Sequence, residues 1–272
     1  MNRFADPRSG YNRLNGKEQT AYKSFVPTPL QDVELNIDDE MKRLADKALA
    51  HIKQKDKEEI DVSEEAIKSS VRLAWNVPPL FLMTNDKELE EKSLIDRNNL
   101  RNALEYGLEH LETLPLSGRI IKDMHWIAMQ GEHNEKKYPG EFRKSPIWIG
   151  DERDNLATAP FIPPSPDDMQ KAFYDLEEYI NAEDDFNPLI KAALIHYQFE
   201  VIHPFIDGNG RIGRLLVLLF LVDKGLLHGC TINLSGALHI RQFFYYSGIA
   251  SIEISGTYEK WLRFFLKTLA EA

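Results

Sequence analysis

Twelve consecutive residues, HPFIDGNGRIGR at 203–214, bring together the side-chain types that phosphate chemistry uses. His203 carries an imidazole whose ordinary pKa, about 6.5, suits a general base at neutral pH. Asp207 is a carboxylate of the kind that holds Mg²⁺ together with phosphate oxygens. Arg211 and Arg214 are suited to bidentate phosphate contacts. The stretch therefore predicts a site for nucleotide or other phosphate chemistry.

The glycines of the same stretch lie where a helix is expected to begin. Gly208 and Gly210 flank Asn209 directly before the apolar run LLVLLFLV at 215–222. Glycine lets backbone N–H groups point inward as an anion nest, and a helix N-terminus adds the positive end of its dipole. Phe205 is expected to anchor the preceding loop. Spacings of three and four residues are expected to place the carboxylate and both arginines on one side of the first turns.

Two more familiar interpretations of the glycine spacing fail. Gly208, Gly210 and Gly213 fit G-x-G-x-x-G, but a dinucleotide fingerprint must follow a hydrophobic strand, and Pro204 makes a poor central strand. A protein-kinase loop requires HRD and DFG motifs, which are missing, and no G-x-x-x-x-G-K-[ST] is present. The residues around the glycines therefore carry more information than the glycines themselves.

The stretch resembles the signature of the Fic family, H-P-F-x-[DE]-G-N-G-R-x-x-R, and every fixed position matches. The resemblance implies transfer of AMP from ATP to a Ser, Thr or Tyr hydroxyl of a target protein. It also implies that the protein modifies itself in the same way. His203 would take the hydroxyl proton and Asp207 would hold Mg²⁺. The implied nucleotide-binding residues are Gly208, Asn209, Gly210, Arg211, Ile212, Gly213 and Arg214. Transfer of UMP, phosphocholine or phosphate, and a nucleotide-sensing adaptor without catalysis, remain alternatives.

Other segments extend the resemblance from about residue 25 onward. PGEFRKSPIWIG at 139–150 is similar to the family's flap, which implies that the target docks on Ile147, Trp148, Ile149 and Gly150. LSGALHIRQFFYYSGI at 234–249 is similar to the segment that places a tyrosine pair, here Tyr245 and Tyr246, beside the adenine. The N-terminal part resembles that of the larger bacterial members. Members with this layout often form homodimers, which leaves the oligomeric state open.

The sequence departs from the family where an inhibitory helix is expected. Many members carry [ST]-x-x-x-E-[GN], whose glutamate pairs with the second motif arginine. Here EAIKSSVRLAW at 65–75 aligns Ser69 and Ser70, but Leu73 stands in place of the glutamate. Ser255 and Glu259 have the right separation near the C-terminus, without the Gly or Asn. We therefore expect a degenerate inhibitory motif near 69–74, so that ATP binds without release of a helix.

Hydrophobic periodicity predicts a mainly α fold: a Fic helical-bundle core, a small β-hairpin flap and an N-terminal helical extension. We expect an irregular, partly mobile arm at 1–35, and a division into residues 1–114 and a catalytic domain at 115–272. The core stripe of the long helix is expected to include Leu94. The predicted helices cover about 37–52, 63–76, 86–114, 119–130, 167–182, 188–202, 209–225, 236–250 and 257–270.

Composition restricts the partners. The 272 residues have a formal net charge of −10, which argues against nucleic acid and against an anionic membrane. The single cysteine, Cys230, and the absence of an apolar leader predict a cytoplasmic protein. The longest apolar run, 215–222, is far short of the roughly 20 residues of a membrane helix and indicates a buried core helix.

Overall fold

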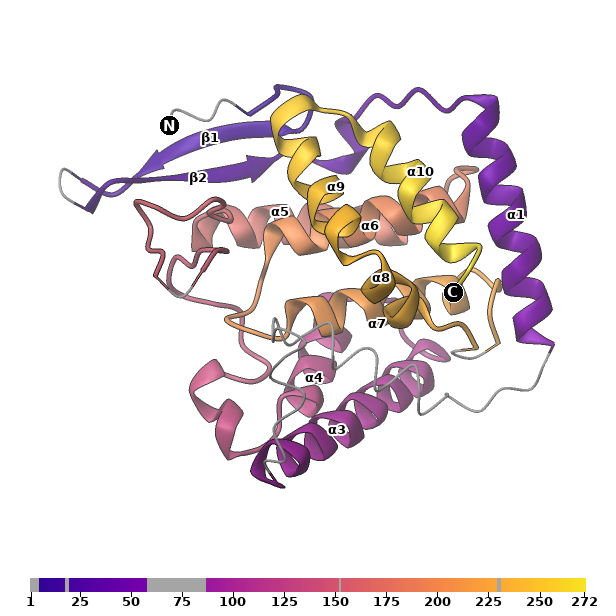
Figure 1. The fold of residues 1–272 in the computed structure, drawn as a ribbon, viewed down its shortest axis with the longest axis horizontal. Coiled ribbons are helices and arrows are strands. Elements are labelled where there is room, and N and C mark those ends of the chain that lie inside the picture. Colours follow the sequence, from indigo (N-terminus) through magenta and orange to yellow (C-terminus); the bar gives the residue numbers. More distant parts are fainter. Residues whose placement is uncertain (1–4, 18–19, 58–86, 152, 229–230) are drawn as a thin grey trace.

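The computed structural model describes residues 5–17, 20–57, 87–151, 153–228 and 231–272. Over these residues the fold is mainly α, as predicted, with one small antiparallel sheet (Figure 1). The predicted helix at 63–76, with Leu73, lies outside the described residues. The α-helices are α1 Asp39–Asp56, α3 Lys87–Leu111, α4 Gly118–Ala128, α5 Pro166–Asn181, α6 Pro188–Ile202, α7 Asn209–Asp223, α8 Leu234–Ile240, α9 Gln242–Ser255 and α10 Tyr258–Leu269.

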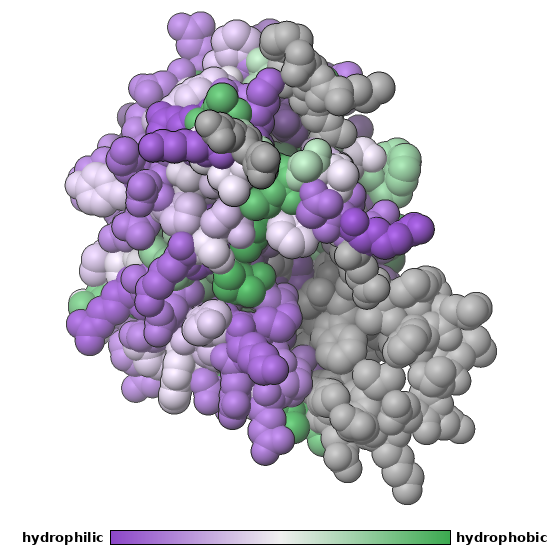
Figure 2. Space-filling view, turned by 90° about the vertical axis from the view of Figure 1, so that its left-hand side faces the viewer, coloured by the Kyte–Doolittle hydropathy of each residue, from purple (hydrophilic) through white to green (hydrophobic). Residues whose placement is uncertain are grey.

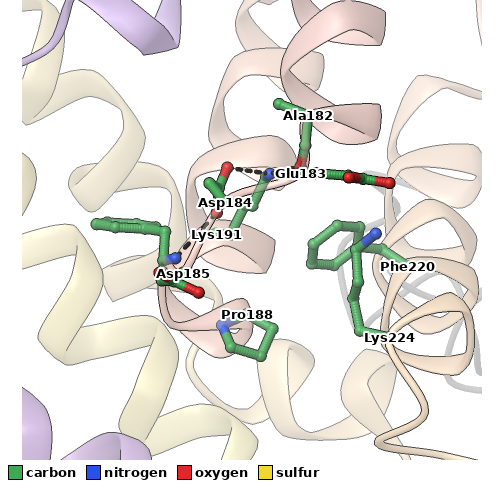
Figure 3. Close-up of a pocket in the computed structure, with 9 residues that line it drawn as sticks. Ala182, Glu183, Asp184, Asp185, Pro188, Lys191, Phe220 and Lys224 are labelled. Atoms are coloured by element: carbon green, nitrogen blue, oxygen red, sulfur yellow. Dashed lines mark hydrogen bonds and ion pairs between the residues drawn. The ribbon is translucent and has the colours of Figure 1, made fainter.

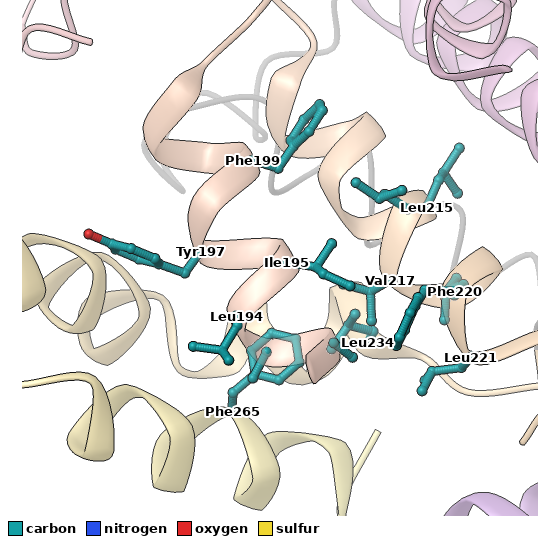
Figure 4. Close-up of a cluster of buried hydrophobic side chains, with 14 of the residues drawn as sticks. Leu194, Ile195, Tyr197, Phe199, Leu215, Val217, Phe220, Leu221, Leu234 and Phe265 are labelled. Carbon is teal, nitrogen blue, oxygen red and sulfur yellow. The ribbon is translucent and has the colours of Figure 1, made fainter. Parts of the chain in front are cut away.

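Helices α6 and α7 form the centre of the core. Nearly every residue of α6 is buried, and its apolar residues are not confined to one face, which is the pattern of a helix enclosed on all sides. The run 215–222 lies in α7, so its prediction as a buried core helix is confirmed. Figure 4 shows side chains of α6, α7, α8 and α10 meeting in this core, among them Ile195, Val217, Leu234 and Phe265.

The other helices pack around this pair. Helix α5 and helix α10 both contact α6, and α1 lies along α10, at the right of Figure 1. On the opposite side α3 packs on α4 and α7, closely enough that a Cβ at Gly107 would lie 2.6 Å from Leu219 Cδ1. The helices N-terminal to residue 115 thus contact the central helices directly, and the division at 114/115 stays a prediction. None of the described helices is long and apolar enough to cross a membrane.

Capping residues set the helix boundaries that sequence patterns predicted. The side chains of Asp38, Ser165 and Asn187 accept backbone N–H groups at the starts of α1, α5 and α6. Proline follows at once at 166 and 188, where the missing N–H has no cost. In α3, the predicted stripe holds for Leu100, Ala103 and Leu104, which are buried, but Leu94 is 50% exposed near the helix start.

The prediction of an irregular arm at 1–35 was wrong for its middle part. Strands β1 Gly10–Asn15 and β2 Tyr22–Pro27 form an antiparallel hairpin, with Gly10 opposite Pro27 and Asn15 opposite Tyr22. The prolines misled the prediction: Pro27 closes β2, a position where proline is tolerated. Phe25 and Val26 are buried, so packing fixes the hairpin. A short 3₁₀ turn, η2 Leu30–Asp32, follows.

Two further expectations need correction. The flap hairpin is reduced to one antiparallel bridge between Ile149 and Phe161, with N–H···O distances of 2.9 and 3.4 Å. The Phe25 N–H donates to the Ile162 carbonyl at 2.9 Å, so β2 lies beside the flap. The helix expected at 236–250 is divided into α8 and α9 at Arg241, whose ψ of 24° interrupts the regular turn.

Candidate active site

His203 ends α6 in a left-handed backbone conformation, with φ of 48°. Its Nδ1 lies 3.0 Å from the backbone carbonyl of Glu200. A carbonyl only accepts, so Nδ1 carries the proton and Nε2 carries the lone pair. Burial, with a smaller contribution from Arg143, lowers the pKa of His203 to about 4. The half-buried imidazole is therefore neutral at pH 7, with a basic Nε2 that bonds to none of the described residues.

Asn209 and Phe205 shape the loop that follows. The Asn209 side chain accepts the Phe205 N–H at 2.9 Å and donates to the Phe205 carbonyl at 2.9 Å. The oxygen and the nitrogen of its side-chain amide therefore both bond to the loop. The side chain of Asn209, a predicted phosphate-binding residue, is thus used to hold the loop. Phe205 is buried, as predicted for an anchor, and stacks on His125 with 3.7 Å between ring centroids.

His125 of α4 is a buried residue of the site that the sequence reasoning missed. Its Nδ1 accepts the Gly140 N–H at 2.8 Å, so Nε2 carries the proton and donates to the Asp207 carbonyl at 2.9 Å. Burial lowers the pKa of His125 to about 4, which keeps this tautomer neutral. A lone histidine on an amphipathic helix gives no sequence signal of such a role.

Asp207 lies at the mouth of the site and is half-buried. Its Oδ1 accepts the Gly208 N–H at 2.7 Å, and its Oδ2 is paired with Lys137 Nζ at 2.7 Å. Burial opposes ionisation, but Lys137, Arg211 and the Gly208 N–H together lower the pKa of Asp207. Lys137 ends the 3₁₀ helix η4 Glu132–Lys137 and was not predicted.

The two motif arginines are both buried, at 3% and 2% exposure. Arg211 Nη1 lies 3.6 Å from Asp96 Oδ2, and Arg214 Nε donates to Ser235 Oγ at 3.1 Å. Burial lowers the pKa of Arg214, which remains a cation at neutral pH. The prediction placed both, with Asp207, on one side of the first turns of α7. In the structure they lie in the protein beneath the helix start, each beside a polar partner that sequence spacing could not reveal.

Two of the motif glycines have physical reasons to be glycine. Gly208, the N-cap of α7, has φ of 80°, a region that side chains with a Cβ rarely adopt. A Cβ at Gly213 would lie 2.5 Å from Glu200 Oε1. Burial raises the pKa of Glu200 to about 7, and its Oε1 has no hydrogen-bond partner within the described chain. Ile212 is fully buried, so this predicted nucleotide-binding residue has its side chain in the core.

The tyrosine pair is divided between core and surface. Tyr245 is 3% exposed, and its hydroxyl lies 3.1 Å from His196 Nε2. His196 Nδ1 in turn lies 3.2 Å from the Gly213 carbonyl, which joins α9 to the motif helix. Tyr246 is 44% exposed, with its ring 5.0 Å from that of Tyr245. Tyr245 is therefore a core residue, and only Tyr246 offers a ring to the surface.

The flap residues are more exposed. Trp148 and Ile149 are 42% and 39% exposed, Gly150 is exposed, and Ile147 is half-buried. Figure 2 faces the side of the molecule that carries the tip of the hairpin; this side is largely hydrophilic, with hydrophobic side chains in a narrow strip near its middle. The predicted docking residues thus have accessible surface.

Arg143 joins the flap to the motif loop. Its guanidinium donates to the carbonyls of Pro164, His203, Ser145 and Ile202 at 2.6, 2.8, 3.3 and 3.3 Å, and its backbone N–H donates to the Pro204 carbonyl. Burial lowers its pKa to about 10, so the group stays charged at pH 7. The sequence showed an arginine in PGEFR but not these partners.

Glu259, the C-terminal candidate for an inhibitory glutamate, has another partner. It pairs with Arg8 at 2.6 Å and accepts the Asn36 N–H at 3.1 Å. A hollow lined by Asp184, Lys191, Phe220 and others, drawn in Figure 3, lies near the start of α6 and the end of α7. His203 follows the other end of α6. Lys191 and Asp184 are paired there at 2.7 Å, so the hollow adds nothing to the candidate site.

Comparison with known proteins points to one family. A model of the Fic/DOC family matches residues 115–221. The chain is 38% identical over 138 residues to the protein adenylyltransferase Fic of Drosophila willistoni, and 39% identical to that of Drosophila erecta. Each match covers 48% of this chain but 26% of the relative, so the chain spans about a quarter of the relatives' length.

Solved structures share the fold. A Fic family protein from Desulfovibrio desulfuricans superposes with a TM-score of 0.67 at 20% identity, covering 88% of this chain and 74% of that one. A Fic domain containing signaling protein from Bacteroides thetaiotaomicron gives 0.57 at 23% identity, covering 86% and 93%. The motif at 203–214, the match of residues 115–221 to the Fic/DOC family and the shared helical fold all indicate similarity to the Fic family.

Proposed function

We propose that this protein transfers AMP from ATP to a hydroxyl group of a target protein. One observation carries the proposal: His203 has a neutral imidazole whose Nε2 keeps its lone pair, because Nδ1–H donates to the Glu200 carbonyl. The curated relatives, which are named protein adenylyltransferases, support the same reaction.

His203 acts as the general base in this proposal. Its Nε2 takes the proton of the target Ser, Thr or Tyr hydroxyl while the oxygen attacks the α-phosphorus of ATP. The bond to pyrophosphate breaks, and AMP is left on the target oxygen. The Glu200 carbonyl holds Nδ1–H throughout, so the ring keeps its orientation as it becomes an imidazolium. Positioning and electrostatics supply most of the acceleration.

The phosphates bind at the start of α7. The N–H groups near Gly208, Asn209 and Gly210 and the helix dipole attract the negative charge. Arg211 and Arg214 offset it from beneath, and Arg211 Nε and Nη1 have no hydrogen-bond partner among the described residues, so both can donate to a ligand. The backbone and the guanidiniums, rather than the Asn209 side chain, do the binding.

A magnesium ion fits the residues at the mouth of the site. No three potential ligands among His, Cys, Asp and Glu cluster in the described chain, but a metal held by one carboxylate and substrate phosphates does not need them. Asp207 supplies the one carboxylate, and its Oδ2 is already paired with a cation, the ammonium group of Lys137. Bound there, Mg²⁺ would offset charge on the phosphates.

The target segment docks on the flap, along Ile147, Trp148, Ile149 and Gly150, and Tyr246 offers the nucleotide base a ring. With Leu73 in place of the expected glutamate, and with Glu259 paired to Arg8, ATP binds without release of an inhibitory helix. Self-modification is expected for the same reason.

A comparison of self-labelling by wild type and by Leu73→Glu tests this role of residue 73. Equal self-labelling by the two proteins would contradict it.

Labelled ATP tests the reaction. We expect label from the α-phosphorus to appear on protein, and label from the γ-phosphorus to remain in pyrophosphate. Label from γ alone would show phosphate transfer instead. No protein label from either position, with tight ATP binding retained, would favour the nucleotide-sensing adaptor.

A further inference from the structure

Asp96 of α3 is a buried carboxylate that the mechanism above does not use. It is 1% exposed and lies on the apolar face of α3, in line with Leu100, Ala103 and Leu104. A charge in such a position is costly unless it is paired and hydrogen-bonded. Its partners therefore indicate why it is there.

Those partners divide between its two oxygens. Asp96 Oδ1 accepts from His133 Nε2 at 3.0 Å and from Asn134 Nδ2 at 3.4 Å, both in η4. Asp96 Oδ2 faces Arg211 Nη1 at 3.6 Å. Two side chains of η4 thus hold one oxygen and direct the other at a guanidinium of the motif.

The Asp96–Arg211 contact is an ion pair longer than a hydrogen bond. Arg211 is 3% exposed, and Asp96 offsets its buried charge together with Asp207, whose pKa Arg211 lowers. At 3.6 Å the carboxylate offsets the charge without a hydrogen bond, and Nε and Nη1 have no hydrogen-bond partner in the described chain. The carboxylate therefore lies beside the guanidinium and leaves these two N–H donors unused.

We propose that Asp96 is a positioning residue that orients Arg211 for the phosphates of ATP, with His133 and Asn134 holding Asp96. The inference rests on the proposed nucleotide site. It makes α3, which lies outside the matched segment 115–221, a part of that site.

Binding measured by calorimetry separates this role from a structural one. ATP and adenosine are the probes, with Asp96→Asn as the variant and Glu105→Gln, an exposed carboxylate on the same helix, as the control. We expect Asp96→Asn to raise the Kd for ATP about tenfold and to leave the Kd for adenosine unchanged, since adenosine has no phosphate for Arg211 to bind. The control should change neither value.

A double-mutant cycle with Arg211→Gln tests whether Asp96 acts on ATP binding through Arg211. Asp96→Asn should have no further effect on ATP binding in the Arg211→Gln background. An equal loss in both backgrounds, an equal loss for adenosine, an unchanged ATP Kd, or tighter ATP binding would each overturn the inference. Tighter binding would mean that Asp96 only repels phosphate.

A second variant covers a failure of Asp96→Asn to fold. His133→Ala keeps the charge of Asp96 but removes the N–H that holds Oδ1, and should weaken ATP binding about threefold with adenosine unaffected. Unchanged ATP binding in a folded His133→Ala protein would then overturn the inference. A wild-type protein that binds ATP but labels no target would count against AMP transfer, and would leave the role of Asp96 standing.

Discussion

His203, His125 and Asn209 have one property in common: each bonds to backbone atoms. His203 Nδ1 holds the Glu200 carbonyl, His125 joins Gly140 to the Asp207 carbonyl, and Asn209 closes the loop on Phe205. Such bonds set tautomers and loop shape together. The geometry of the candidate site is therefore fixed by hydrogen bonds between these side chains and the backbone.

The low pKa of His203 predicts an unusual pH profile. A histidine with an ordinary pKa would become protonated, and useless as a base, as pH falls through about 6.5. Because burial lowers the pKa to about 4, Nε2 stays unprotonated well below that pH. We expect single-turnover AMP transfer to keep its rate from pH 7 to about 5.5. A loss of most activity between pH 7 and 6, in protein that stays folded, would contradict this.

Asn209→Asp should damage the loop although the two side chains have the same shape. The carboxylate would still accept the Phe205 N–H, but it would face the Phe205 carbonyl without a proton to donate. We expect urea unfolding to show a loss of roughly 2–3 kcal/mol, typical of a buried polar group left unpaired. Asn102→Asp, at an exposed position of α3, is the control and should change stability by less than about 0.5 kcal/mol. Equal effects in the two variants would refute this role of Asn209.

At the scale of elements, sequence patterns predicted what is local and missed what is distant. The helices followed from 3.6-residue periodicity, and in the structure a cap such as Asn187, followed by proline, begins α6 where that pattern begins. The β1–β2 hairpin was missed because it is stabilised by burial of Phe25 and by a bond to Ile162, far along the chain. The motif residues were found by type and spacing. Their partners Asp96 and His125 were not, although a carboxylate on an apolar helix face is a signal that could have found Asp96.

Arg143 predicts that the flap and the motif loop behave as one unit. Arg143→Lys keeps the charge but replaces five N–H donors in a planar fork by three at one point, so it cannot serve the same carbonyls. We expect the free energy of unfolding to fall by roughly 2–4 kcal/mol and AMP transfer to fall at least about tenfold. Arg153→Lys, at an exposed position beyond the flap, serves as the control. A fully active and stable Arg143→Lys protein would mean that the hydrogen bonds from Arg143 to these carbonyls are not needed to hold the flap and the motif loop together.

At the scale of the whole molecule, three histidines held neutral make stability depend on pH. Burial lowers the pKa of His125 and of His203 to about 4 and that of His196 to about 3, so below about pH 6.5 the unfolded chain binds protons that the folded chain does not. Glu200, whose pKa is raised to about 7, has the opposite effect between about pH 4.5 and 7.

We therefore expect the free energy of unfolding to fall as pH drops from about 6 to 4.5, since three histidines oppose one glutamate. The net slope should be on the order of 2.7 kcal/mol per pH unit, the contribution of two protons. Urea unfolding at several pH values measures it. Stability that is constant or rises over this range would show that the histidines are not held neutral.

Contacts across the whole chain explain why the site could only be partly predicted. Arg8 reaches Glu259, and Asp96 reaches Arg211, over separations that no local pattern encodes. The residues proposed to perform the chemistry stand together in the sequence at 203–214, whereas the residues that contact them come from α3, α4, η4 and the flap.

The most direct test of the central claim is transfer of label from α-labelled ATP to protein by wild type and by His203→Ala. The control is His228→Ala, which removes an imidazole that is 89% exposed and pairs with Asp56. We predict equal labelling by wild type and His228→Ala, and a loss of at least about a hundredfold in His203→Ala, the typical contribution of a general base. Labelling that persists unchanged in His203→Ala would contradict the account.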